Sequence, residues 1–90
     1  MIILSTKEKL LKRLLEEPKD FTYNELKSLL EYFNFTEYNS GKTSGSRVKF
    51  INTENKHIIL LHKPHPGNIL KSYVIEYVIK ELTKGGYINE

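Results

Sequence analysis

The chain of 90 residues contains no cysteine. Neither a disulfide framework nor a thiolate metal site can form, so added stability has to come from packing or from a partner. Long apolar runs are also missing, because the run Met1–Leu4 is followed at once by charged residues and is too short for a signal peptide or a membrane span. These absences predict a cytoplasmic protein without a membrane partner.

The chain also lacks internal repeats, and its length suits one domain, because two smaller domains would each bury too little surface. Its net charge of +3 is unevenly distributed. Residues 41–71 contain six basic residues and one acidic residue. Residues 1–40 contain six basic and seven acidic residues, and residues 72–90 contain two basic and three acidic residues. A basic segment of this kind favours a polyanionic partner. A solvated lysine-rich surface is the alternative interpretation.

Two capping boxes, Ser5-x-x-Glu8 and Thr22-x-x-Glu25, each predict the start of a helix. In such a box the hydroxyl of the Ser or Thr accepts a hydrogen bond from the N–H of the Glu three residues later. The carboxylate of that Glu accepts a hydrogen bond from the N–H of the Ser or Thr. The leucines that follow have helical spacing. The sequence therefore predicts helices over about 6–17 and 23–33.

From Phe35 onward the hydrophobic period changes to two, which is typical of strands. Three segments rich in aromatic and β-branched residues follow, at 35–38, 47–51 and 57–61. The turns that join them favour antiparallel pairing. Ser72 is a plausible N-cap and Gly85 the expected C-cap of a last helix over 72–84. The predicted fold is α+β: a three-stranded antiparallel sheet with helices on one face, in the α-β-β-β-α order of double-stranded-RNA-binding domains, preceded by one extra helix.

The second predicted strand has one apolar and one mostly basic face. Val48 and Phe50 share the apolar face, while Arg47 and Lys49 lie on the other, where they could meet the phosphates of RNA. His62 ends the third predicted strand beside Lys63, so an imidazole could transfer protons next to an ammonium that holds a phosphate. The alternative interpretation of the basic face is an ordinary half-exposed sheet with a polar outer face. The alternative interpretation of His62 is a polar residue that simply ends a strand.

The sequence resembles the HicA toxins, small bacterial mRNA interferases that are neutralised by a HicB antitoxin. The resemblance covers about residues 22–82. It rests on the leucines of the second helix, on Gly45-Ser46-Arg47-Val48-Lys49-Phe50, on a strand ending in His62, and on Pro66-Gly67-Asn68-Ile69-Leu70-Lys71 before the last helix. It implies a core over 21–90 and an N-terminal helical extension over 1–20.

One position departs from the family pattern. HicA toxins usually carry Gly-Ser-His at the start of the second strand, and Arg47 stands where that histidine is expected. An arginine cannot act as a general base, because its pKa lies above about 12. The resemblance therefore leaves His62 or His57 for proton transfer.

The resemblance implies a chemistry in which the ribose 2′-hydroxyl attacks the adjacent phosphate, a reaction that needs neither a metal nor a cofactor. The residues expected to take part in catalysis are His62, His57 and Arg47. The residues expected to bind RNA are Lys42, Arg47, Lys49, Lys63, His65 and Lys71. The histidines lack the spacing of a metal site, so we expect none. The expected partners are mRNA and a HicB-like antitoxin. A non-cleaving RNA-binding module and a domain whose basic face docks an acidic protein remain alternatives.

Overall fold

The computed structural model describes residues 5–39, 47–64 and 67–89 and has the predicted α+β fold, in the order α-α-β-β-β-α. The elements are α1 (Thr6–Leu15), α2 (Tyr23–Tyr32), β1 (Phe35–Asn39), β2 (Arg47–Asn52), β3 (Ile58–His62) and α3 (Ser72–Lys84). Within these three ranges, no helix is both long and apolar enough to cross a membrane.

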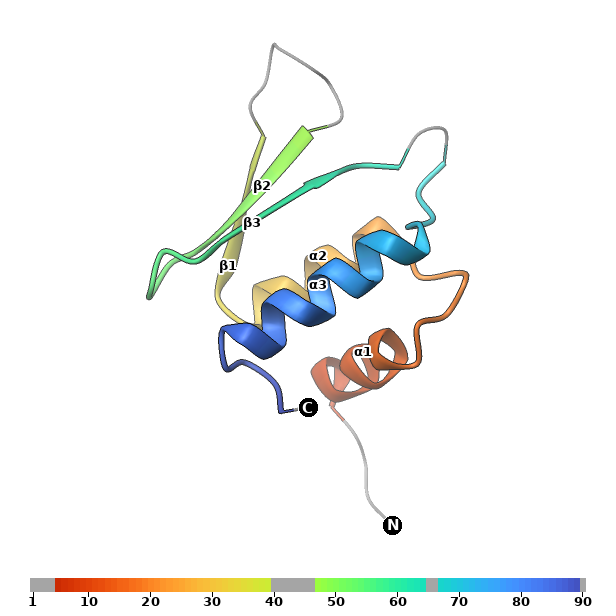
Figure 1. Ribbon diagram of the computed structural model, residues 1–90, viewed down its shortest axis with the longest axis horizontal. Coiled ribbons are helices and arrows are strands. Elements are labelled where there is room, and N and C mark those ends of the chain that lie inside the picture. The colour runs from red at the N-terminus through yellow and green to blue at the C-terminus, as the bar shows by residue number, and fades with distance from the viewer. Residues whose placement is uncertain (1–4, 40–46, 65–66, 90) are drawn as a thin grey trace.

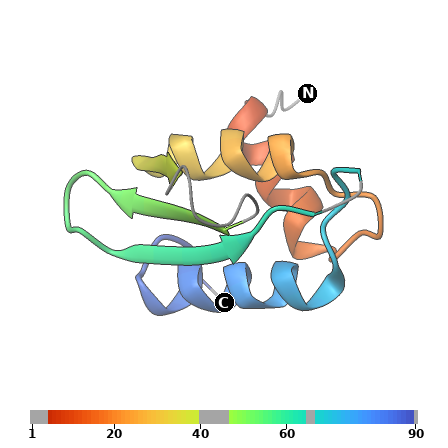
Figure 2. The ribbon, with the colours of Figure 1, turned by 90° about the horizontal axis from the view of Figure 1, so that it is seen from above.

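The strands form one antiparallel sheet in the order β1-β2-β3, as predicted. Both α2 and α3 pack on the same face of this sheet (Figure 1). Figure 2 shows these two helices running along the two sides of the strands. α1 lies on the far side of the helix pair from the sheet and packs against both helices (Figure 1). Among the described residues, nothing covers the other face of the sheet.

Apolar and polar residues alternate along β2, and the pairing of β3 with β2 decides which residues of β3 lie on the covered face. Val48, Phe50, Ile59 and Leu61 are buried against the helices, and their neighbours in the sequence are exposed or half-buried. The helices contribute the other half of the core through buried residues at helical spacing: Leu26, Leu29 and Leu30 of α2 and Val74, Ile75, Val78 and Leu82 of α3. Leu14 of α1 completes it from behind.

Both predicted capping boxes are present. Ser5 N–H donates to Glu8 at 2.9 Å, and Thr22 N–H donates to Glu25 at 3.0 Å; in each box the N–H of the glutamate donates back to the hydroxyl. These bonds satisfy N–H groups that the first turn of a helix leaves without a partner. Both helices therefore begin where the sequence predicts.

The predicted bounds of α1, α2 and the three strands differ from the observed ones by one or two residues, and the N-cap of α3 by one. α1 ends at Leu15 instead of residue 17, because Glu17 has a φ of 51° that no right-handed helix contains. The N-cap of α3 is Lys71, and Ser72 is already helical. β3 begins at Ile58 and ends at His62, so His57 lies outside the strand and His62 inside it.

Gly85 is the C-cap of α3, as predicted, and a close approach explains why a glycine is needed there. A Cβ atom at this position would lie 2.5 Å from Tyr87 Cε2 and 2.9 Å from His57 Nδ1. The left-handed backbone conformation that often ends a helix occurs one residue later, at Gly86, with a φ of 80°. The missing side chain at Gly85 lets the ring of His57 pack against the end of α3.

Candidate nucleic-acid interface

Arg47 and His62 are cross-strand neighbours on the uncovered face of the sheet. The antiparallel register places Arg47 of β2 directly opposite His62 of β3, and both residues are exposed. Side chains at directly opposite positions have Cβ atoms about 4.5–5.5 Å apart. The guanidinium and the imidazole can therefore reach the same phosphate group.

Lys49 lies one pair further along the same face. It is opposite Leu60 on one side and Tyr38 on the other, and all three residues are exposed. The uncovered face thus carries two cations and an imidazole beside exposed apolar and aromatic side chains. This mixture distinguishes the face from a purely polar outer surface.

A hollow of about 230 Å³ opens beside His62, between the end of β3 and the start of α3. It is lined by His62, Lys63, Pro64, Leu70, Lys71, Tyr73 and Val74. The sequence predicted roles for His62, Lys63 and Lys71 separately, and the structure brings these three residues together around one cavity. Two ammonium groups and an imidazole around a concave site are suited to an anion such as a phosphodiester.

Main-chain hydrogen bonds between distant segments hold this hollow in shape. Leu70 N–H donates to the carbonyl of Phe21 at 2.9 Å, and Tyr23 N–H donates to the carbonyl of Asn68 at 2.8 Å. Because these bonds join residues 68–70 to the start of α2, they set the position at which α3 begins. Lys71, the N-cap of α3, has an extended backbone and no side-chain capping bond. The positive end of the helix dipole therefore adds to the positive potential of the hollow.

Lys63 is oriented by a cluster on the helix side of the sheet. Its Nζ lies 5.3 Å from the centre of the Tyr23 ring, and the Tyr23 hydroxyl donates to Glu37. Lys27 Nζ is 3.4 Å from the other carboxylate oxygen of Glu37. Burial alone would raise the pKa of Glu37, but the bond from Tyr23 and the Lys27 ammonium outweigh it and lower the pKa. The ionised Glu37 thus attracts Lys63 from the side opposite Arg47.

Burial also raises the pKa of the Tyr23 hydroxyl, and the bond to Glu37 raises it further. Tyr23 therefore remains a neutral donor, and its ring stays available to Lys63. A cation over an aromatic face is stabilised by the ring quadrupole.

His57 lies at the opposite end of β3 from His62. Its Nε2 is 2.8 Å from Glu81 Oε1, and its ring packs against Phe35 and Tyr87, with both ring centres at 5.7 Å. These contacts join the β2–β3 turn to the C-terminal end of α3. The structure therefore groups His62 with Arg47 and places His57 elsewhere. Lys42 and His65, two further predicted RNA-binding residues, lie outside the described residues.

A family model described as the HicA toxin of bacterial toxin–antitoxin systems matches residues 23–83. The chain belongs to the HicA toxin family. The match begins at the first residue of α2 and ends within α3, so α1 lies outside it. No curated protein and no solved structure matched the chain.

Two aromatic residues of this HicA domain were missed as candidates. Tyr73 lines the hollow beside His62, and Tyr38 stands next to Lys49 on the uncovered face. A signal for Tyr73 was present, because an aromatic residue there falls outside the apolar stripe of Val74, Ile75 and Val78. The sequence could not indicate that this side of α3 faces β3.

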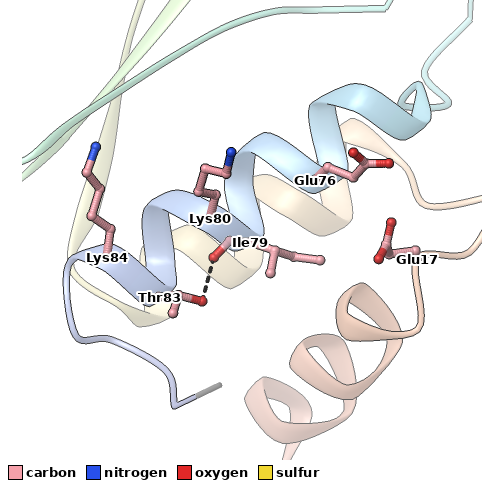
Figure 3. A pocket seen from close by; sticks show the side chains of 6 residues that line it. All are labelled: Glu17, Glu76, Ile79, Lys80, Thr83 and Lys84. Carbon is pink, nitrogen blue, oxygen red and sulfur yellow. Dashed lines mark hydrogen bonds between the residues drawn. The ribbon is translucent and has the colours of Figure 1, made fainter.

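A second cavity of the HicA domain, of about 470 Å³, lies between α3 and the segment after α1 (Figure 3). It is lined by Glu17, Glu76, Ile79, Lys80, Thr83 and Lys84. The Thr83 hydroxyl already donates to the Ile79 carbonyl at 2.8 Å. Charges of both signs and the lack of a histidine among its lining residues make this cavity a poorer match to a polyanion than the hollow beside His62.

Proposed function

We propose that this HicA-family chain is an endoribonuclease that cleaves mRNA at the hollow beside His62. The observation that carries the proposal is the position of His62, which faces Arg47 across the sheet and also lines the hollow with Lys63 and Lys71. A base and two lysines thus line one hollow, and a guanidinium lies across the sheet from the base. Members of this family are generally ribonucleases, which supports the assignment.

The proposed reaction is an internal transesterification. The ribose 2′-hydroxyl attacks the adjacent phosphorus, His62 accepts the hydroxyl proton, and a phosphorane with an additional negative charge forms. The bond from phosphorus to the 5′-oxygen then breaks, and that oxygen takes a proton from water. A 2′,3′-cyclic phosphate and a 5′-hydroxyl remain. A positioned general base contributes about 10²–10⁴-fold to such a step.

The cations of the site would act on the charge that develops in this reaction. Arg47 approaches from the sheet, and Lys71 from the start of α3, so the phosphorane oxygens would be contacted from two sides. A planar guanidinium can donate two parallel hydrogen bonds to phosphate oxygens. Such donors stabilise a transition state most when they are held in place beforehand.

The experiment that tests this function is the cleavage of a labelled mRNA by the purified protein. His62→Ala should abolish cleavage and the cyclic phosphate product, whereas Lys12→Ala, on the remote helix α1, should leave both unchanged. The protein should remain folded in both cases, because both side chains are exposed. Cleavage by His62→Ala at the rate of the wild type would refute the proposal.

A second candidate function is favoured by Arg47 itself. An arginine at the position of the family histidine suits binding of RNA without cleavage, because it supplies charge but no base. The wild type would then bind RNA in a salt-dependent manner and release no cyclic phosphate at any pH from 5 to 8.

We also propose that a HicB-like antitoxin inhibits the protein by covering this same surface. The uncovered face exposes Tyr38, Ile58 and Leu60 beside its cations. Exposed apolar side chains grouped with charges are typical of protein-binding surfaces. A partner that buried them would also exclude RNA from Arg47 and His62. Competition between antitoxin and RNA in a binding assay tests this.

A further inference from the structure

The groove between β3 and α3 continues beyond the hollow beside His62. A neighbouring cavity of about 270 Å³ is lined by Leu60, Leu61, His62, Tyr73, Val74 and Tyr77. His62, Tyr73 and Val74 line both cavities, so the two adjoin. The first contains two lysines among its lining residues, and the second contains no lysine, arginine or carboxylate. A charged compartment and an apolar aromatic compartment thus lie side by side.

Tyr73 lines both compartments, and the residue is 65% exposed. The residues of α3 that pack into the core are Val74, Ile75, Val78 and Leu82, so Tyr73 belongs to another side of the helix. Leu60, which also lines the second cavity, is 53% exposed. Large apolar surfaces exposed together in a concave site are suited to a flat apolar ligand.

Tyr77, in contrast, has a role in the fold. It is half-buried, and its hydroxyl accepts the N–H of Leu60 at 3.2 Å. That bond also shows which way the main chain of β3 faces. In an antiparallel pair, alternate residues direct their N–H and C=O groups away from the partner strand. Because Leu60 directs its N–H toward α3, His62, two residues further on, directs its main-chain groups to the same side, where it lines both cavities.

The groove therefore combines an exposed aromatic ring, an apolar wall and a line of main-chain donors and acceptors. A nucleobase has complementary features, since its faces stack on aromatic rings and its edge forms hydrogen bonds. The adjoining hollow has the positive charge that a phosphate of the same nucleotide needs. Two compartments of different chemistry in contact match the two parts of a nucleotide.

We propose that the cavity beside Tyr73 binds one unpaired nucleobase of the RNA whose phosphate lies at His62. This inference rests on the proposed function and adds a substrate class to it. A base within a duplex has both faces stacked and its edge paired, so it cannot enter the cavity without leaving the helix. The site therefore selects single-stranded RNA, although the fold order is that of double-stranded-RNA-binding domains.

Binding of three probes by fluorescence anisotropy tests the proposal. The first is a labelled octa-adenylate with 2′-O-methyl riboses, which cannot be cleaved because the attacking hydroxyl is blocked. The second has the same backbone without bases, and the third is an RNA duplex of the same length. We expect the wild type to bind octa-adenylate more tightly than either of the others.

The variants separate stacking from charge. Tyr73→Ala should weaken octa-adenylate binding by about 5- to 100-fold, the usual loss when one stacking ring is removed, and should leave the abasic probe unaffected. Tyr73→Phe should retain the affinity of the wild type. Tyr32→Ala provides a matched control, since this tyrosine is 48% exposed on α2 and lines neither cavity. Tyr73→Trp adds a direct readout, because stacking on octa-adenylate should quench the indole fluorescence.

Several results would overturn the inference and leave the proposed function intact. These are equal binding of octa-adenylate and the abasic probe, tighter binding of the duplex, or a Tyr73→Ala variant that binds all probes like the wild type. A Tyr73→Ala variant that loses only the binding of a protein partner would assign the cavity to that partner. If no probe binds even at low salt, both the proposed function and the nucleobase site are wrong.

Discussion

The Nε2 atom of His57 lies 2.8 Å from Glu81 Oε1, and this contact joins the β2–β3 turn to the C-terminal end of α3. Both side chains are largely buried, and the imidazole is also packed between aromatic rings. The pair thus holds together two segments that are distant in the sequence. Its position at the far end of β3 separates it from the proposed site of cleavage.

The first prediction is that replacing His57 lowers the stability of the fold much more than replacing His62. His57→Ala should reduce the free energy of unfolding by about 1–3 kcal/mol, because it removes the partner of Glu81 Oε1 and the contacts with two aromatic rings. His62→Ala should change it by less than about 0.5 kcal/mol, since the side chain is exposed. Urea titrations of both variants provide the measurement. Equal destabilisation by the two changes would contradict this division of roles.

The second prediction concerns Arg47. If the guanidinium stabilises charge and His62 transfers the proton, Arg47→Ala should slow cleavage and weaken RNA binding without abolishing either. Arg47→Lys should recover part of the loss, because an ammonium supplies the charge without the paired hydrogen bonds of a guanidinium. Single-turnover cleavage rates measure the effect. A complete loss in Arg47→Ala, matching that of His62→Ala, would show that Arg47 has more than an electrostatic role.

The third prediction is a steep dependence of RNA affinity on salt. Each phosphate of single-stranded RNA that a cation neutralises contributes about −0.7 to the slope of log affinity against log salt. Lys71→Ala should therefore make the slope shallower by about 0.7. Lys12→Ala, which removes the same charge from the far side of the molecule, should leave the slope as it is. A filter-binding titration between low and moderate salt distinguishes the two, and identical slopes for both variants would exclude Lys71 from the interface.

The fourth prediction follows from the lowered pKa of Glu37. A carboxyl whose pKa is lower in the folded than in the unfolded state stabilises the fold above its unfolded pKa and loses this contribution as pH falls through the folded one. At pH 7 Glu37→Gln should therefore be less stable than the wild type by about 1.5–3 kcal/mol, the usual value for hydrogen bonds to a charged group. The difference should shrink below about pH 4.5. Urea titrations from pH 3 to 7 measure it, and a constant difference over this range would contradict the assignment.

Local signals in the sequence were sufficient for most of the fold. The capping boxes at Ser5 and Thr22 predicted the starts of α1 and α2, because the bonds involved span only three residues. The bounds of α3 were also predicted, but its N-cap was placed one residue too late, because no local side-chain bond marks it. The bond from Leu70 N–H to Phe21 joins segments 49 positions apart in the sequence, and it lies one residue before the N-cap Lys71.

The candidate site was predicted only in part for a similar reason. The alternation in β2 indicated that Arg47 and Lys49 occupy exposed positions, but the pairing of Arg47 with His62 of β3 required the structure. The place of Lys71 in the same hollow as His62 depends on how residues 68–70 attach to α2. The role of Tyr73 could not be predicted, because it depends on which side of α3 lies along β3.

α1 lies behind the helix pair, on the opposite side from the uncovered face of the sheet. An attachment to the exposed side of α1, for example through Lys9, would therefore leave Arg47, His62 and the groove beside Tyr73 facing the solution. A sensor surface that holds the protein in this orientation would keep both an RNA strand and a HicB-like protein free to approach. α1, which lies outside the residues matched by the family model, is thus a suitable attachment point. Competition between the RNA and the HicB-like protein can then be measured on one immobilised molecule.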